Sequence, residues 1–123
     1  FTEVVELNTK ITNVNNLRVL RICKECGATM FNKDSNMFCP VCNSETQNYL
    51  KAALTAEIED QSGHVIAIFK KSCLLEMTGF DELQLEKDAG IYEFKNKQLK
   101  LVGYLRKNKQ TQENEFLVLN VKV

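Results

Sequence analysis

Two CxxC pairs constrain this chain more than any other feature of its sequence. Cys23 with Cys26, and Cys39 with Cys42, lie within the 20 residues of "CKECGATMFNKDSNMFCPVC". Secreted domains held by disulfides spread their cysteines and usually have an even number of them. Here four thiols crowd together and the fifth, Cys73, stands alone. The pattern therefore favours a metal site and a reducing, intracellular compartment.

The spacing of the four thiols fits a structural zinc site. A CxxC pair places two sulfurs on one side of an ion, and two such pairs complete a tetrahedral shell. The intervening "GATMFNKDSNMF" predicts a short strand, a polar turn and a second short strand. Two redox dithiols would need a βαβ context that the sequence lacks. A catalytic zinc would use histidine or a carboxylate, and the only histidine lies far along the chain. We therefore predict a closed, structural Zn²⁺ site formed by Cys23, Cys26, Cys39 and Cys42.

Composition places the rest of the chain among ordinary globular proteins. Its 123 residues are 44% apolar, and no apolar run is long enough to span a membrane. The length allows one domain, so we expect a single unit over residues 1–123 with the cysteine segment, 23–42, inserted in it. Because the formal net charge is zero, any binding to nucleic acid must come from a local patch.

Alternating apolar residues predict five strands, with a helical stretch between the third and the fourth. The first strand has two parts, on either side of the turn-rich "TNVNN", and the cysteine segment follows it. The predicted strand ranges are 1–7 with 17–22, 50–60, 64–70, 97–107 and 115–123. This order is that of the OB-fold, a small Greek-key barrel. We therefore predict an all-β fold with a helical insertion, an OB barrel that carries a four-cysteine zinc ribbon.

Two short segments supply the helical insertion. "KSCLLEMTG" predicts a helix with Ser72 as its N-cap and Gly79 as its C-terminal stop. "DELQLEKDAG" predicts a second one, with Asp81 and Gln84 in a capping box and Gly90 at its end.

The same alternation predicts which side chains fill the barrel. The residues expected in the core are Leu50, Ala52, Leu54, Ala56, Ile58, Phe69, Leu74, Leu75, Met77, Leu99, Leu101 and Leu105. Cys73 is expected to be a buried core thiol that neither binds metal nor forms a disulfide. Gly103, inside a strand, suits a bend of the barrel or the close approach of another backbone.

The stretch "EIEDQSGHVIAIFKKSCLLEMTG" and the ending "FLVLNVKV", with the cysteine spacing and the strand order, carry a family resemblance. Over nearly its whole length the chain resembles the C-terminal zinc-ribbon OB domain of the replication protein A large subunit, including its telomere-associated paralogues. It departs from that family in having no tryptophan, and in having His64 and Val65 where the family often has an aromatic residue. The resemblance implies a non-catalytic, nuclear domain that binds single-stranded DNA in replication, repair or telomere maintenance, together with partner subunits.

Basic and aromatic side chains on one strand and its following loop are the first candidates for contact with DNA. Lys100, Tyr104 and Arg106 share the strand face opposite the leucines, and Lys107 and Lys109 continue into the loop. OB domains stack bases on such aromatic side chains and hold phosphates with such cations. A plain solvated face is the alternative for this group.

Four further candidates lie elsewhere in the sequence. Phe31 and Phe38 flank the turn of the cysteine segment, where packing over the zinc site is the favoured role and base stacking the other one. Tyr49, where the chain rejoins the barrel, suits packing and DNA contact equally well. Lys70 ends a strand, and is either a plain exposed side chain or a phosphate contact. His64, beside a turn, is expected to be solvated.

Two function classes are consistent with these residues. One is a single-stranded DNA-binding module of a replication protein A-like large subunit. The other is a protein-interaction module of the same family that docks partner subunits and contacts DNA weakly. An enzyme is not expected, because the sequence shows no nucleophile–base–acid set and no glycine-rich phosphate loop.

Overall fold

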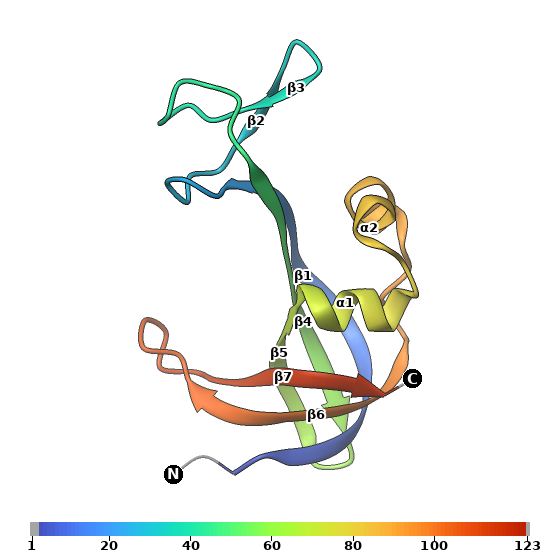
Figure 1. The fold of residues 1–123 in the computed structure, drawn as a ribbon. Coiled ribbons are helices and arrows are strands. Elements are labelled where there is room, and N and C mark those ends of the chain that lie inside the picture. Colours follow the sequence, from blue (N-terminus) through green and yellow to red (C-terminus); the bar gives the residue numbers. More distant parts are fainter. Residues whose placement is uncertain (1–2, 123) are drawn as a thin grey trace.

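The fold is described by a computed structural model of residues 3–122 (Figure 1). Residues 1, 2 and 123, which belong to the first and last predicted strands, lie outside the described part. The elements are β1 (Val5–Cys23), β2 (Phe31–Lys33), β3 (Asn36–Phe38), β4 (Asn48–Asp60), β5 (Gly63–Lys70), α1 (Lys71–Thr78), α2 (Glu82–Asp88), the 3₁₀ helix η1 (Ala89–Ile91), β6 (Gln98–Lys107) and β7 (Asn114–Lys122).

Five of the strands close into a barrel in the order β1-β4-β5-β7-β6. The β5–β7 pair is parallel, and the other pairs are antiparallel. The helices lie between the third and fourth barrel strands, and the hairpin of β2 and β3 between the first and second. This is the topology of the OB-fold, and it confirms the predicted fold class.

The predicted break in the first strand is wrong. β1 is one continuous strand, and the asparagine-rich residues 12–16 lie inside it rather than in a turn. Register shifts between Ile11 and Asn13, and between Val14 and Asn16, mark β-bulges in this stretch. Bulges bend a strand without ending it, so β1 pairs first with β6 and then with β4.

The alternation of β4 is confirmed, because its predicted core residues point into the barrel. The fully or almost fully buried residues of β4 are Leu50, Ala52, Leu54, Ala56 and Ile58. Helix α1 packs on β4, β5 and β7 and closes one end of the barrel (Figure 1). The prediction for Cys73 as a core thiol is confirmed, since it is 2% exposed and its Sγ lies 3.7 Å from the carbonyl oxygen of Val118. Burial raises the pKa of this thiol.

The start of α1 differs from the sequence prediction, whereas its end agrees. The strand β5 runs directly into the helix, so Lys70 is the N-cap and makes no side-chain capping bond. Ser72 lies inside the first turn and is not the cap, since the helix begins one residue before it. Gly79 ends the helix in the left-handed conformation, with φ 74°, and its N–H donates to Leu75.

Helix α2 begins as predicted but ends earlier. The Asp81 carboxylate accepts a hydrogen bond from the backbone N–H of Gln84 at 2.8 Å, which is the N-cap half of the predicted capping box. Gly90 does not end the α-helix, because the chain has already tightened into the 3₁₀ turn of η1.

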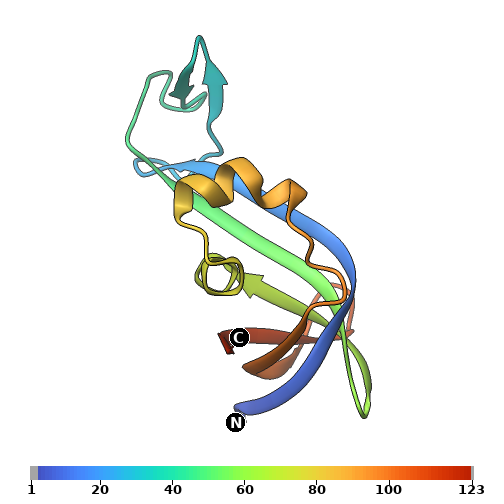
Figure 2. The same ribbon diagram turned by 90° about the vertical axis from the view of Figure 1, so that its right-hand side faces the viewer.

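The extension of β1 and β4 that rises from the barrel is here called the stalk, and α2 lies beside it (Figure 2). One ion pair joins α2 to β1 of the stalk, and a second joins α2 to α1. Arg21 of β1 binds both carboxylate oxygens of Glu86, at 2.8 and 2.9 Å, and this lowers the pKa of Glu86. Arg21 also donates to the Asn48 side chain of β4 at 3.3 Å. Lys71 joins Glu82 at 2.7 Å. The helical segment therefore braces the stalk from one side.

The middle of β6 approaches β7 very closely at Gly103. A Cβ atom on this residue would lie 2.0 Å from the carbonyl oxygen of Leu117, so no other residue fits without moving the backbone. A register shift between Val102 and Gly103 lies at the same point. The close approach predicted for Gly103 is therefore present.

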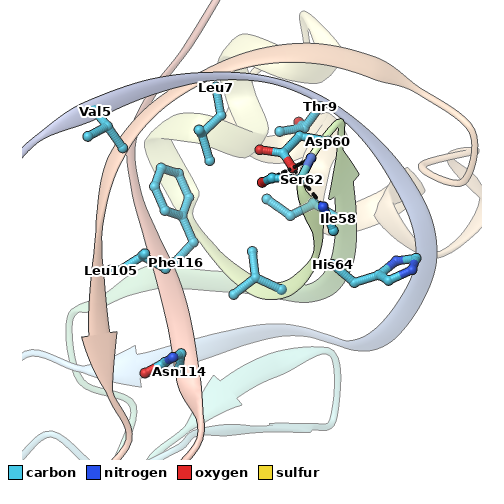
Figure 3. A pocket seen from close by; sticks show the side chains of 12 residues that line it. Val5, Leu7, Thr9, Ile58, Asp60, Ser62, His64, Leu105, Asn114 and Phe116 are labelled. Atoms are coloured by element: carbon cyan, nitrogen blue, oxygen red, sulfur yellow. Dashed lines mark hydrogen bonds between the residues drawn. The ribbon is translucent and has the colours of Figure 1, made fainter.

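Leu105 is not a core residue, contrary to the sequence prediction. It is 55% exposed, because the pairing of β1 with β6 stops at Gly103 and leaves this position uncovered on that side. It lies at the mouth of the barrel, beside a cavity of about 280 Å³ (Figure 3). The apolar residues around that cavity are Val5, Leu7, Ile58, Val65, Leu105 and Phe116.

Candidate metal centre and nucleic-acid interface

The segment between β1 and β4, residues 24–47, is here called the ribbon, and it stands at the far end of the stalk from the barrel (Figure 1). Its hairpin of β2 and β3 turns at Asp34 and Ser35, which have φ values of 50° and 71°. Positive φ at both central residues gives the twist that matches two antiparallel strands, and short polar residues tolerate it. The strand–turn–strand expectation for this segment is therefore met.

The ribbon brings the four sulfurs of Cys23, Cys26, Cys39 and Cys42 together. All four lie within 4.8 Å of one another. Cys23 and Cys42 Sγ are 3.9 Å apart, and Cys26 and Cys39 Sγ are 3.5 Å apart. An ion with four thiolates at about 2.3 Å places its sulfurs about 3.8 Å apart, so the cluster has the size of a tetrahedral metal site.

Hydrogen bonds to sulfur surround this cluster. The backbone N–H of Glu25 donates to Cys23 Sγ at 3.3 Å, and that of Cys42 donates to Cys39 Sγ at 3.4 Å. The Thr46 hydroxyl lies 2.9 Å from Cys23 Sγ. Such contacts favour thiolate over thiol, and they orient the ligands of a metal site.

The four thiols do not ionise alike. The Thr46 hydroxyl, and then two backbone N–H groups, lower the pKa of Cys23 to about 6. The side chain of Cys26, and then burial and the other sulfurs, raise the pKa of Cys42 to about 12. Ionisation of one thiol therefore makes ionisation of the neighbouring thiols less favourable. A cation among the four sulfurs would remove this opposition, so the donor set fits a thiophilic metal ion.

Methionine packs over the cysteines, whereas phenylalanine was expected there. Met30 is 5% exposed and forms a small cluster with Cys23 and Cys39, and Met37 packs against that cluster. The expectation that Phe31 or Phe38 covers the site is wrong. These two rings are partners on the other face of the hairpin, because side chains alternate along each strand.

The phenylalanine pair forms a separate surface on the ribbon. The Phe31 and Phe38 rings meet edge to face with centroids 5.7 Å apart, and Lys33 Nζ lies 4.5 Å from the Phe38 centroid. Phe31 is 46% exposed. The structure thus leaves an aromatic edge and a cation open to solvent.

The strand register of the barrel defines a row of side chains on its outer surface. Thr55, Ile68, Leu117 and Tyr104 are neighbours in turn across β4, β5, β7 and β6. We call this surface, with the residues that continue it along the same strands, the outer face. Two of its strands, β4 and β5, correspond to the strands that OB-folds use for oligonucleotide binding. The two loops that contribute to binding in those folds correspond here to the ribbon and to residues 108–113.

Two other predicted residues also belong to the outer face. Tyr49 of β4 alternates in phase with Thr55 and is 44% exposed, near the ribbon. Lys70 of β5 alternates in phase with Ile68 and is exposed, opposite Ala53 of β4. The structure therefore brings Tyr49, Lys70 and Tyr104 to the same outer face, although they are far apart in the sequence.

The sequence prediction did not find the aliphatic part of the outer face. Ile66, Ile68 and Leu117 are half-buried on it and lie between the polar positions. The alternation of β5 indicates that Ile66 and Ile68 oppose the buried Ala67 and Phe69. Their place beside Leu117 depends on the parallel β5–β7 register, which no local pattern reveals.

Lys100 lies apart from the other candidates of β6. It is at the opposite end of the strand from Lys107, and its Nζ is 3.5 Å from Glu6 of β1. The same carboxylate is 3.7 Å from Lys122. This group is therefore a separate basic cluster, three strands wide, rather than part of the row that contains Tyr104.

Arg106, Lys107 and Lys109 lie at the far end of β6 and in the loop that follows it. The Arg106 Nε donates to Glu115 of β7 at 2.6 Å, which leaves the other guanidinium donors for further contacts. Lys107 and Lys109 are exposed. Within residues 3–122 neither of these lysines forms an ion pair.

Comparison with solved structures finds the same architecture in a protein of known structure. The fold matches a chain of replication protein A. The solved structure is described as "Structure and Conformational Change of a Replication Protein A Heterotrimer Bound to ssDNA". The TM-score is 0.68 at 11% sequence identity, and the match covers 99% of the present chain. The chain spans 32% of that replication protein A chain, so it is similar to only a part of it.

At this identity the likeness to replication protein A is one of fold. No protein-family model and no curated protein matches the sequence. None of the helices in the described residues is both long and apolar enough to cross a membrane.

Proposed function

We propose that the chain is a single-stranded DNA-binding OB domain of a replication protein A-like large subunit. The observation that carries the proposal is the outer face, which places Tyr49, Lys70 and Tyr104 beside the loop of Lys107 and Lys109. The solved neighbour, a replication protein A heterotrimer bound to single-stranded DNA, supports it. The role is binding rather than catalysis, in DNA replication, repair or telomere maintenance in the nucleus.

The outer face supplies two kinds of contact for a single strand. Tyr104 and Tyr49 offer ring surfaces for stacking, each worth about 1–3 kcal/mol per base. Ile66, Ile68 and Leu117 form an apolar floor on which further bases can pack. Such contacts do not discriminate between bases, so the proposed binding has little sequence preference.

The cations at the edges of the outer face hold phosphates. Lys70, Lys107 and Lys109 are exposed, and Arg106 retains donors beyond its bond to Glu115. Lys100, in the separate basic cluster, would contact a phosphate only where the DNA strand continues along β6. The net charge of zero then matters little, because the cations are local to the face.

We further propose that the metal is one structural Zn²⁺ bound by Cys23, Cys26, Cys39 and Cys42. Four thiolates in a closed tetrahedral shell are a common ligand set for structural zinc. The ion would supply the ribbon with the stability that its small apolar cluster does not provide. It would thereby hold the Phe31–Phe38 edge in place as an additional stacking surface.

Partner subunits of a replication protein A-like or telomere complex are part of the proposal, because the solved neighbour is a heterotrimer. A module that docks such partners and scarcely touches DNA is the other outcome of the test below.

The test is a fluorescence anisotropy titration with a labelled single-stranded oligonucleotide of about 16 nucleotides, at several salt concentrations. We expect saturable binding. The logarithm of the association constant should fall linearly with the logarithm of the salt concentration, with a slope of about −0.7 for each phosphate contact. Lys109→Ala should make this slope shallower by about 0.7. Lys95→Ala is the matched control, because Lys95 is exposed beside Asn13 and Val14 of β1, away from the outer face. Binding only in the millimolar range would contradict the DNA-binding proposal and favour partner docking.

A further inference from the structure

We propose that Glu115 is a positioning residue, which orders the loop of residues 108–113 and thereby places Lys107 and Lys109 against the phosphates. This inference rests on the proposed DNA-binding function and names a residue that would act through others. Glu115 would not touch the nucleic acid itself. An acidic residue would then promote binding to a polyanion, which is opposite to the effect of its charge alone.

The burial of Glu115 is the first observation. Its side chain is 7% exposed, although it points outward between the core residue Phe116 and the exposed Asn114. A carboxylate out of water is costly unless its oxygens are bonded. Here both oxygens have partners, since Oε1 accepts from Arg106 Nε at 2.6 Å and Oε2 accepts from Asn108 Nδ2 at 3.4 Å.

The second observation is that Asn108 is the root of the loop. Its side-chain oxygen accepts the backbone N–H groups of Gln110 and Thr111, at 2.8 and 3.2 Å. Its backbone N–H donates to the carbonyl of Glu113, and its carbonyl accepts from Gln112, both at 2.8 Å. The side chain of Asn108 thus closes the turn through its oxygen and binds Glu115 through its nitrogen.

These bonds connect the barrel wall to the position of the two lysines. Lys107 pairs with Asn114 at the end of the β6–β7 ladder, and Lys109 follows Asn108 directly. A loop that is ordered before binding loses less conformational entropy when it contacts a ligand. Glu115 therefore contributes to affinity by fixing Asn108 and, through it, the two lysines.

The test compares two substitutions that remove the same charge from neighbouring positions. Glu115→Gln keeps the shape of the side chain but weakens its bonds to Arg106 and Asn108. Glu113→Gln is the matched control, because Glu113 is exposed and contributes only backbone atoms to the loop. Charge alone predicts slightly tighter binding of single-stranded oligonucleotide for both. We expect binding to be about three- to tenfold weaker for Glu115→Gln, and unchanged or up to about twofold tighter for Glu113→Gln.

A double-mutant cycle separates positioning from general destabilisation. In a variant that carries Lys107→Ala and Lys109→Ala, Glu115→Gln should cause no further loss, because the residues through which it acts are gone. Without DNA, the amides of Gln110, Thr111 and Gln112 should exchange faster in Glu115→Gln than in the parent. A structural role alone would give losses that add and would not concentrate the faster exchange in this loop.

The outcomes also separate this inference from the proposed function. If the parent binds oligonucleotide and Glu115→Gln binds as tightly as Glu113→Gln, the positioning role is wrong and the DNA-binding function stands. If the parent does not bind, both are wrong. If Glu115→Gln fails to fold, Asn108→Asp tests the same link. It keeps the turn acceptor but cannot donate to Glu115, and Gln110→Glu is its charge-matched control. Equal affinities for that pair would overturn the inference.

Discussion

The barrel and the ribbon are stabilised in different ways, although one strand runs into both. Within the described residues the barrel core has 19 buried members, including Phe69, Phe116 and Leu101. The ribbon cluster has three, which are Cys23, Met30 and Cys39. Burial at about 25 cal/mol per Å² of apolar surface can hold the first unit but not the second. The barrel thus has the apolar packing to hold itself together, whereas we expect the ribbon to depend on the proposed metal ion.

Loss of the metal gives the largest expected effect, and it should be confined to the ribbon. Structural zinc contributes about 10–16 kcal/mol to the folding of small metal-binding units. In Cys26→Ser, or after chelation, we expect the amides of residues 24–47 to lose protection from hydrogen exchange while those of β5 and β7 keep it. Zinc content below about half an equivalent in the untreated parent would contradict a zinc site. Global unfolding of Cys26→Ser would show that the two units are not separately stabilised.

Truncation of the barrel core should have the converse effect. Phe116 is fully buried, and Phe116→Ala should lower the free energy of unfolding of the barrel by about 3–5 kcal/mol. The low end of that range is expected, because Phe116 also borders the cavity at the barrel mouth (Figure 3), where water can replace part of the ring. Chemical denaturation followed by circular dichroism measures the loss. Metal content at room temperature should remain that of the parent, and its loss would mean that the ribbon depends on barrel packing.

A smaller effect is expected on the outer face, where the change should affect binding and leave both units folded. Tyr104→Ala should cost about 1–3 kcal/mol of affinity for single-stranded DNA, with an unchanged salt slope, because stacking involves no phosphate. Anisotropy titration at two salt concentrations measures both quantities. Unfolding of Tyr104→Ala would mean that its side chain faces the core and that the strand register is wrong.

The smallest effect is predicted for the one cysteine of the barrel. Cys73 is packed among apolar side chains, so Cys73→Ala should lower the free energy of unfolding by about 1 kcal/mol. Metal content should be unchanged, in contrast to Cys26→Ser. The pair of variants sharpens the comparison between the two regions. A cysteine acts as a hydrophobic side chain in the barrel and as a metal ligand in the ribbon. Metal loss in Cys73→Ala would contradict this division.

The sequence predicted those features whose signal is local. Ligand spacing indicated the four clustered cysteines, and the alternation of residues 50–58 indicated the inward face of β4. Gly79 and Asp81 marked helix ends through their own backbone and capping chemistry. Each of these features depends on residues within a few positions of one another, which is why a pattern can reveal it.

The missed features depend on pairing between distant segments. Residues 12–16 have turn chemistry, but pairing with β4 keeps them extended. Leu105 has the alternation of a core residue, and it is exposed because the pairing of β6 with the distant strand β1 stops at Gly103. Arg106 was predicted as a phosphate contact without its partner, because Glu115 becomes its neighbour only through the β6–β7 register. The row that joins Ile68 to Leu117 similarly needs the parallel β5–β7 pair.

Cys23 is both the last residue of β1 and the first of the four clustered thiols, and this has a consequence for the order of folding. β1 and β4 pair at Cys23 and Asn48, so their pairing must close a loop of residues 24–47. The entropic cost of closure grows with the length of the loop, and a metal-bound ribbon shortens the part that remains free. We therefore expect metal added before refolding to speed up barrel formation, because β1 and β4 can then pair progressively from the ribbon end of the stalk toward the bulges of β1. Metal added after refolding should not change that rate, because the loop is already closed.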